Sequence, residues 1–259
     1  MFEQIFAYFY RQQLIMRRRP GDLAWIFIHP FISLFSIGIL AFFVVQKGAP
    51  VNSLMFVFVG VIMWNFYDLV QRAVTYGIAF DIWSSSLKHS FSSGASPRHF
   101  IIGNSLFGLY SAFISFVLVG VAAYFAFGFN ILLAGWSLLN LIPVFLFAAG
   151  AGLMINCLMV SKGEKYMALI WSLTGIVMIF SGVYYPTNVL PFPIADISQA
   201  MPSTHSINSM RAAFGYSPEN TVSEFLIGFL MSIVYFVVGI VVFLYGLKKG
   251  YQNGTITKY

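Results

Sequence analysis

The stretch LAWIFIHPFISLFSIGILAFFVV at residues 23–45 decides the class of the fold, because it contains no Asp, Glu, Lys or Arg. A membrane-spanning helix needs about 20 consecutive apolar residues, since it must cross a hydrocarbon core of roughly 30 Å at about 1.5 Å per residue. The stretch is long and apolar enough to meet this need. It therefore predicts a transmembrane helix.

The composition of the whole chain agrees with this interpretation. Of its 259 residues, 59% are hydrophobic and only 8% are charged, whereas a soluble domain carries about 25% charged residues. This excludes a water-soluble enzyme and a disordered chain. The net charge of +6 comes from basic residues spread along the chain, so no basic face is formed and we predict no nucleic-acid partner.

Further apolar runs follow the first one. They are continuous rather than alternating, which indicates helices instead of barrel strands. We predict an all-α integral membrane protein with six transmembrane helices, forming a single domain over residues 1–259. The predicted spans are residues 23–45, 54–79, 100–127, 131–160, 167–186 and 225–247.

The positions of Lys and Arg predict the orientation. If the N-terminus is placed inside, the cytoplasmic segments hold every Lys and Arg except Lys47 and Arg211. Cytoplasmic loops of membrane proteins carry an excess of these residues. We therefore predict a multi-pass protein with both termini in the cytoplasm.

Two cytoplasmic segments are predicted to be helical. The first sixteen residues place apolar side chains on one helical face, which favours a helix lying in the membrane interface over a frayed lead-in to the first span. In the loop at residues 80–99, Trp83, Leu87 and Phe91 recur every four residues and predict one stripe on a short helix. That stripe either lies on the membrane surface or enters a groove in another protein.

The outward-facing segment at residues 187–221 is too long for a simple connection. It is rich in apolar residues, and Pro191, Pro193 and Pro202 divide it into short pieces. We predict a re-entrant or interface-bound helical hairpin, with a helix near residues 204–214.

Polar and small residues inside the spans predict contacts between helices. Asp68 and Arg72 are four residues apart, so they share a helical face and can pair, as a structural pair or an inner gate. Small residues let helices approach closely, and amides join them. The residues concerned are Ala148, Gly150, Gly152, Asn65, Asn104, Asn140 and Asn156.

Catalytic signatures are missing from the sequence. No Gly-Lys dipeptide occurs, so there is no Walker A loop, and Cys157 is the single cysteine. The four histidines lack metal-ligand spacing. Residues 202–205 (PSTH) resemble one element of lipid phosphatases, but no second histidine follows. We predict no catalytic, metal or cofactor site in this chain.

The order of segments resembles the permease subunits of type-2 ABC exporters. The most specific stretch is SGVYYP at residues 181–186, followed by Leu190 and Pro191, then Met201 and Pro202, and finally SMR at residues 209–211. It is similar to the family's Ser-Gly-aromatic-aromatic-Pro, Leu-Pro, Asn-Pro and downstream Arg signature. Met201 departs from the pattern, because the family usually has Asn there.

The resemblance implies an assembly in the plasma (inner) membrane. Two permeases, as a homodimer surrounded by membrane lipid, would pair with two ABC ATP-binding subunits that carry ATP and Mg. Residues 1–19 would be an interfacial connecting helix. The residues coupling the permease to the ATPase would be Trp83, Leu87, Lys88 and Phe91. The outer hairpin would help form the exit, with Pro186, Pro191, Pro202 and Arg211 as its signature residues.

The substrate predicted on this resemblance is amphipathic, such as a lipid-linked glycan, glycolipid or polysaccharide. Aromatic side chains stack on sugars, although most aromatics in such a chain face lipid or form interface belts. The candidate pathway residues are Trp64, Tyr67, Tyr110, Tyr184 and Tyr185. Export of hydrophobic drugs or antibiotics, an ATP-independent channel or secondary transporter, and a membrane lipid phosphatase are the alternatives.

Overall fold

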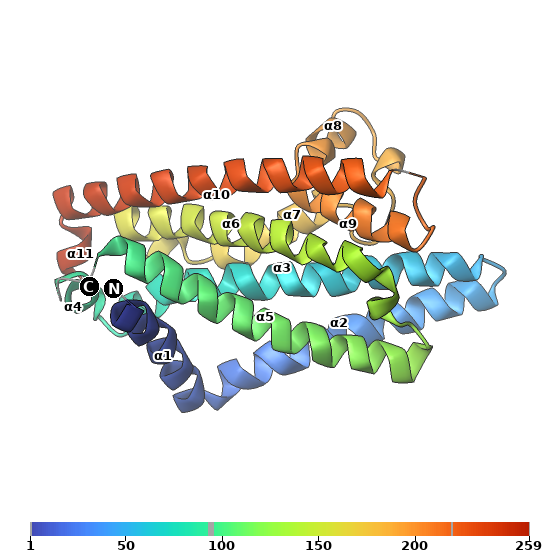
Figure 1. The fold of residues 1–259 in the computed structure, drawn as a ribbon. Coiled ribbons are helices and arrows are strands. Elements are labelled where there is room, and N and C mark those ends of the chain that lie inside the picture. The colour runs from blue at the N-terminus through green and yellow to red at the C-terminus, as the bar shows by residue number, and fades with distance from the viewer. Residues whose placement is uncertain (1, 93–95, 219, 259) are drawn as a thin grey trace.

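Long helices run side by side along the molecule, with α7 among them, while α1, α4, α8 and α11 lie towards its two ends (Figure 1). The computed structural model describes residues 2–92, 96–218 and 220–258. The long elements are α2 (Pro20–Gln46), α3 (Val51–Trp83), α5 (Pro97–Phe127), η1 (Ile131–Asn140) continued by α6 (Leu141–Lys162), and α10 (Thr221–Gln252). The shorter ones are α1 (Phe2–Arg18), α4 (Leu87–Ser92), η2 (Glu164–Tyr166), α7 (Leu169–Phe180), η3 (Thr187–Val189), α8 (Ile194–Gln199), α9 (Pro202–Ala213) and α11 (Thr255–Lys258).

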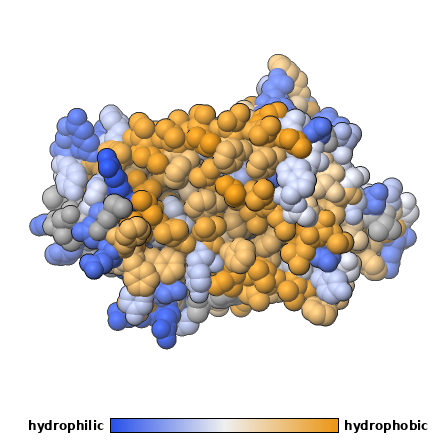
Figure 2. Space-filling model, in the orientation of Figure 1, coloured by the Kyte–Doolittle hydropathy of each residue, from blue (hydrophilic) through white to orange (hydrophobic). Residues whose placement is uncertain are grey.

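The distribution of apolar side chains is that of a membrane protein. Within the described residues, five helices are long and apolar enough to cross a membrane, and none of these residues forms a β-strand. Figure 2 shows apolar side chains covering the middle of the visible face, with hydrophilic ones gathered at its two ends. The prediction of an all-α integral membrane protein is confirmed.

The predicted fifth span, residues 167–186, is shorter than expected. α7 has 12 residues, which reach about 18 Å at 1.5 Å per residue and fall short of a core of about 30 Å. The chain turns at Gly182, whose φ of 61° lies in the left-handed region that favours glycine. The residues after Gly182, from Val183 to Pro186, are apolar or aromatic, so the apolar run continues past the end of the helix.

α3 occupies the centre of the bundle and contacts α2, α5, α6, α7 and α9. In its most apolar window 78% of the residues are buried, against 17% for the corresponding windows of α2 and α10. α3 is therefore the central helix, and the ion pairs of Asp68 and Asp81 involve it. α2 and α10 leave broad apolar faces uncovered in the single chain.

Glycines allow α6 and α10 to approach closely. A Cβ on Gly239 would lie 2.5 Å from the backbone oxygen of Gly150, and a Cβ on Gly246 would lie 2.6 Å from Cys157 Sγ. Helices in lipid associate through small residues in this way. The small residue Gly150 predicts a closely packed neighbouring helix, and that helix is α10. Cys157 packs in the same contact.

The intramembrane amides join helices, as predicted for three of the four asparagines. Asn104 Oδ1 accepts from Gln12 Nε2 at 2.8 Å, Asn140 Nδ2 donates to Ser209 Oγ at 2.9 Å, and Asn156 Nδ2 donates to the backbone oxygen of Val74 at 2.9 Å. These bonds link α5 to α1, η1 to α9 and α6 to α3. Asn65 Nδ2 has no hydrogen-bond partner among the described residues.

Candidate functional site

α1 packs against the bundle through a stripe that includes a polar residue. Tyr8, Gln12 and Met16, spaced four apart, are buried, and a Cβ on Gly103 of α5 would lie only 2.5 Å from Tyr8 Cβ. The apolar face predicted for the membrane interface has Phe2 and Phe6 exposed, Ile5 and Phe9 partly covered, and Met16 buried. Gln12 lies in the buried stripe because it finds an amide partner inside the protein. The location of the exposed part of that face in the membrane interface stays a prediction.

An ion pair fastens α1 to the end of α3. Asp81 is fully buried and pairs with Arg11, whose Nη1 also donates to Asp81 Oδ2 at 3.4 Å. Ser86 Oγ donates to Asp81 Oδ1 at 3.1 Å. This carboxylate therefore holds three segments together: α1, the end of α3, and the turn that leads to α4.

A phenol completes the same assembly. Tyr8 Oη donates to the backbone oxygen of Ser90 in α4 at 3.1 Å. Burial raises the pKa of the Tyr8 phenol. Four segments together form what we call the α1–α4 unit: α1, the last turn of α3, the turn at residues 84–86, and the helix α4. A cavity of about 500 Å³ lies on it, and its lining includes Arg11, Ser86 and His89.

The stripe predicted on one short helix is wrong in its geometry. Trp83 is the last residue of α3 and Leu87 is the first residue of α4, with Ser85 between them at a φ of 51°. Ser84 Oγ donates to the backbone oxygen of Phe80 at 2.7 Å, and such side-chain bonds compete with helix continuation. The serine-rich turn therefore separates the residues that the spacing of four had placed together.

The members of the predicted stripe also differ in exposure. Trp83 is 45% exposed, whereas Leu87 is fully buried and belongs to the core. Lys88 is exposed, and the side chain of Phe91 lies outside the described residues. Trp83 and Lys88 are thus the predicted coupling residues that a partner could reach, and Leu87 supports the unit from inside.

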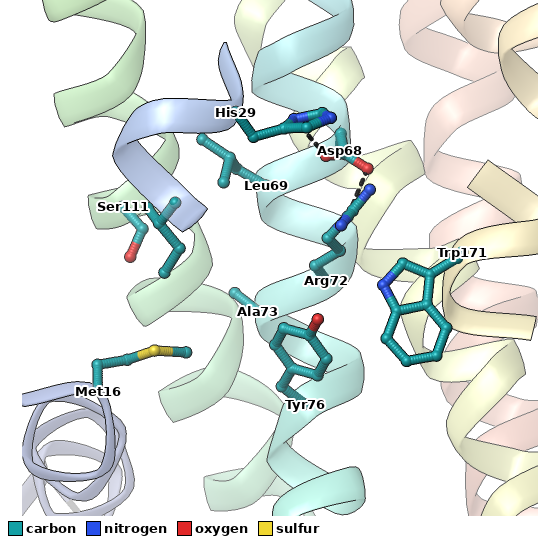
Figure 3. A pocket seen from close by; sticks show the side chains of 10 residues that line it. Met16, His29, Asp68, Leu69, Arg72, Ala73, Tyr76, Ser111 and Trp171 are labelled. Atoms are coloured by element: carbon teal, nitrogen blue, oxygen red, sulfur yellow. Dashed lines mark hydrogen bonds and ion pairs between the residues drawn. The ribbon is translucent and has the colours of Figure 1, made fainter. Parts of the chain in front are cut away.

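The pair predicted at Asp68 and Arg72 is present inside the bundle. Arg72 Nε donates to Asp68 Oδ1 at 2.7 Å, and His29 Nδ1 lies 4.0 Å from Asp68 Oδ2. Figure 3 shows His29 and Arg72 turned toward Asp68 from two helices, with Trp171 of α7 facing them. The sequence offered no signal linking His29 to this pair, because α2 and α3 meet only in the folded bundle.

These side chains line a cavity of about 200 Å³ between α1, α2, α3, α5 and α7. Met16, Tyr76, Ser111 and Trp171 also line it, so its wall is mostly apolar with a few polar groups. Arg72 Nη1 has no hydrogen-bond partner among the described residues. An ionic side chain whose hydrogen bonds are only partly satisfied is costly within a membrane.

The candidate pathway aromatics lie in three separate places. The rings of Trp64 and Tyr67 stack at 4.8 Å, and Tyr67 is 1% exposed, so both belong to the core of the single chain. Tyr110 is exposed on α5 and contacts the ring of Phe9. Tyr184 and Tyr185 line a cavity at the opposite end of the bundle. In the single chain Trp64 and Tyr67 are packed in the core, and the assignment of these five residues to the pathway stays a prediction.

A buried arginine holds the SGVYYP turn against α3. Arg211 of α9 is fully buried, and its guanidinium donates to the backbone oxygens of Gly182 at 2.9 Å, Val183 at 2.7 Å and Phe56 at 3.1 Å. The guanidinium carbon also lies 3.5 Å from the centre of the Phe56 ring. A Cβ on Gly60 would lie 1.9 Å from Val183 O. We call this contact the Arg211 clamp.

The outer segment forms two short helices, α8 and α9, after η3. This agrees with a helical hairpin in form, and α9 covers the predicted helix at residues 204–214 with a shift of one to two residues. Pro186 precedes η3 and Pro202 begins α9, while the backbone oxygen of Pro191 accepts from Ile194 N at 2.8 Å. Whether the hairpin enters the membrane stays a prediction.

The phosphatase-like histidine is used structurally. His205 Nδ1 lies 2.9 Å from Glu224 Oε2 of α10, and its Nε2 lies 2.9 Å from the backbone oxygen of Gln199 in α8. Both ring nitrogens are therefore engaged by the protein, and the ring ties three helices together. The phosphatase alternative would also need a second histidine as nucleophile, and no histidine follows His205 in the sequence.

Comparison with known families gives one match. The family model described as "ABC-2 type transporter" matches residues 3–214. The matched residues include the α1–α4 unit, the Asp68–Arg72 pair and the Arg211 clamp. The comparison with curated proteins found no match.

Proposed function

The chain belongs to the ABC-2 type transporter family, and from this premise we propose that it is the permease subunit of an ATP-driven exporter. Its substrate is amphipathic, such as a lipid-linked glycan, a glycolipid or a polysaccharide. A separate ABC ATP-binding subunit supplies the energy. The permease itself contributes the pathway and the surfaces that receive movement from that partner.

The observation that carries the proposal is the continuity of α3. This helix has 33 residues, which correspond to about 50 Å at 1.5 Å per residue. Asp81 near one end belongs to the α1–α4 unit, and Phe56 and Gly60 near the other end belong to the Arg211 clamp. A displacement of the unit is therefore transmitted along one helix to the turn and hairpin at the far end.

Between these ends, α3 carries the Asp68–Arg72 pair. Closure of the ATP-binding subunits favours one of two arrangements of the permease if it binds that arrangement more tightly. Arg72 has an unpartnered Nη1 in the described structure, so a small rotation of α3 can change the pairing of this charge. This supports a role for the pair as an inner gate.

The proposed orientation places the α1–α4 unit in the cytoplasm of a plasma (inner) membrane. Arg17, Arg18 and Arg19 lie where α1 meets α2, and Lys88 lies in α4. α11 contacts α4, and α1 and α11 both lie toward this end of the bundle (Figure 1). The positive-inside tendency then supports a cytoplasmic location for both termini.

We expect two permeases to pair and to bind two ATP-binding subunits. The broad apolar faces that α2 and α10 leave uncovered support pairing within the membrane. The measurement is the mass of the purified complex in nanodiscs. A complex with one permease per particle would contradict the homodimer.

The proposal is tested by replacing Trp83. A buried aromatic anchor dominates many interfaces, and its loss costs about 2 kcal/mol, or roughly a 30-fold weaker affinity. We expect Trp83→Ala to lose co-purification of a subunit that carries a Walker A sequence. The matched control is Trp136→Ala, because Trp136 is 49% exposed in η1, away from the α1–α4 unit.

Normal binding of the ATP-binding subunit by Trp83→Ala would show that this surface lies on the membrane. If no Walker A subunit accompanies the wild-type permease from native membranes, the ATP-driven function itself is contradicted. An ATP-independent channel or secondary transporter would then take its place.

A further inference from the structure

A cavity of about 820 Å³ lies at the end of the bundle away from the α1–α4 unit. Its walls come from the start of α3, the turn that includes Tyr184 and Tyr185, α8, α9 and the loop that follows α9. The Arg211 clamp lies behind it, because Phe56 both lines the cavity and accepts a bond from Arg211. The cavity is formed by one chain alone.

The lining of this cavity combines aromatic and polar side chains. Tyr184, Tyr185 and Tyr216 supply aromatic faces, and the cavity is also lined by amide side chains and one carboxylate. The residues with these polar groups are Asn52, Asn188, Gln199, Asn208 and Asp196. Among the described residues that line it, none is Lys, Arg or His.

This set of groups selects among the classes of ligand. Each amide offers both hydrogen-bond donors and an acceptor, which matches hydroxyl groups that also donate and accept. A phosphate or carboxylate is bound most strongly by charged donors such as Arg, and the described lining supplies none. An organic cation would use only acceptors and would leave the amide donors unpaired at a free-energy cost.

Asn208 is the lining residue that most strongly indicates a hydrogen-bonding ligand. It is 8% exposed and lines the cavity, and its amide forms no hydrogen bond with another described residue. Asp196, by contrast, is exposed at the outside of the cavity. A bound hydroxyl can pair with the side-chain amide of Asn208 where it lines the cavity, whereas Asp196 stays in contact with water.

Parts of the lining are held in place before any ligand arrives. Tyr185 Oη donates to the backbone oxygen of Ile179 at 2.7 Å, and Gln199 Nε2 donates to Thr187 Oγ1 at 3.4 Å. The ring of Tyr216 stacks on that of Phe214 with centres 5.6 Å apart. Largely preformed polar and aromatic groups in a cavity of this kind are typical of a ligand site.

We propose that this cavity is a subsite for neutral sugar units, in which tyrosine faces cover the ring and the amides of Asn208 and its neighbours bind hydroxyl groups. The inference rests on the proposed export function and deepens it by naming an uncharged glycan as the part of the substrate held at the exit. Each permease copy has its own subsite.

The test measures glycan binding by the permease in nanodiscs. The probe is an array of immobilised neutral oligosaccharides built from hexoses, deoxyhexoses and N-acetylhexosamines, together with uronic-acid and phosphorylated ones. We expect the wild type to retain neutral oligosaccharides in preference to the anionic ones. Asn208→Leu, which keeps the size of the side chain but removes its hydrogen bonds, should weaken binding about tenfold or more.

The control is Tyr124→Ala, since Tyr124 is exposed on α5 and does not line the cavity. It should bind as the wild type does. Each variant is also checked for co-purification of the ATP-binding subunit, which shows that the permease is folded. A second variant, Tyr216→Ala, removes an aromatic face and should weaken the same neutral glycans.

Three results would overturn the subsite: no neutral glycan bound by the wild type, an equal preference for anionic glycans, or full binding by Asn208→Leu and Tyr216→Ala. Binding of tetraphenylphosphonium that is lost in Asp196→Asn would assign the cavity to cationic drugs instead. These failures differ from failure of the export function, because the latter appears as absence of the ATP-binding subunit.

Discussion

The two ends of α3 are held by different chemistry. In the α1–α4 unit, Asp81 binds the Arg11 side chain, which is 31% exposed and within reach of water or a partner. In the Arg211 clamp, a fully buried guanidinium binds backbone oxygens of residues 56, 182 and 183. A side-chain pair near the surface can exchange partners when another protein docks, whereas a clamp on carbonyls can open only if the backbone moves.

The α1–α4 unit is therefore suited to receive movement from a partner, whereas the Arg211 clamp is suited to preserve the shape of the far end. Changes at the clamp should therefore act on stability before they act on coupling. Changes in the α1–α4 unit should act mainly on coupling. The following predictions test that separation, beginning with the largest expected effect.

Arg211→Leu should destabilise the permease most. It leaves three backbone oxygens without their donor, and each unsatisfied buried polar group costs about 1–3 kcal/mol, so the loss should be roughly 3 kcal/mol or more. The measurement is the midpoint of thermal unfolding in detergent. Lys47→Leu is the control, because Lys47 is exposed at the end of α2. An unchanged midpoint for Arg211→Leu would show that the clamp does not hold the turn.

Gly60→Ala should push the SGVYYP turn away from α3. The new Cβ would lie 1.9 Å from Val183 O, and overpacking of this kind costs about 1–3 kcal/mol. Gly175→Ala in α7 is the matched control, since a Cβ there meets no atom within 4 Å. The unfolding midpoint should fall for the first variant and not for the second. Equal midpoints would mean that the turn yields without strain.

The Arg11–Asp81 pair should show its effect in coupling. A double-mutant cycle with Arg11→Gln and Asp81→Asn isolates the pairwise interaction, which we expect to be about 1 kcal/mol in the affinity for the ATP-binding subunit. Substrate-stimulated ATP hydrolysis should fall in each single variant while the unfolding midpoint changes less than in Arg211→Leu. If the pairwise interaction is instead seen only in the unfolding midpoint, the two ends of α3 both serve stability.

Sequence patterns predicted what depends on local spacing. Asp68 and Arg72 pair because a spacing of four places them on one face, and Gly150 allows close packing because it has no side chain. The patterns failed where long-range contacts decide. Arg211 binds Phe56 across a separation of 155 residues, and no periodicity connects them.

Two local errors have physical causes as well. The apolar letters after Phe180 continue beyond α7, so hydropathy could not show that Gly182 ends the helix. The regular spacing of Trp83 and Leu87 concealed a turn at Ser84–Ser86, where hydroxyl groups bond to Phe80 and Asp81. In both places the backbone conformation, rather than the hydrophobic pattern, decided the structure.

The glycine contact between α6 and α10 bears on the synthesis and membrane insertion of the protein. A ribosome makes α6 well before α10, and the segments from η2 to α9 come between them. The face of α6 around Gly150 is therefore exposed to lipid until the later helix has been inserted. Because Gly239 must then approach a backbone atom that a Cβ would meet at 2.5 Å, the pairing is selected by fit within the bilayer. Recognition of the right neighbour thus becomes a step of biogenesis, completed only when α10 reaches the membrane.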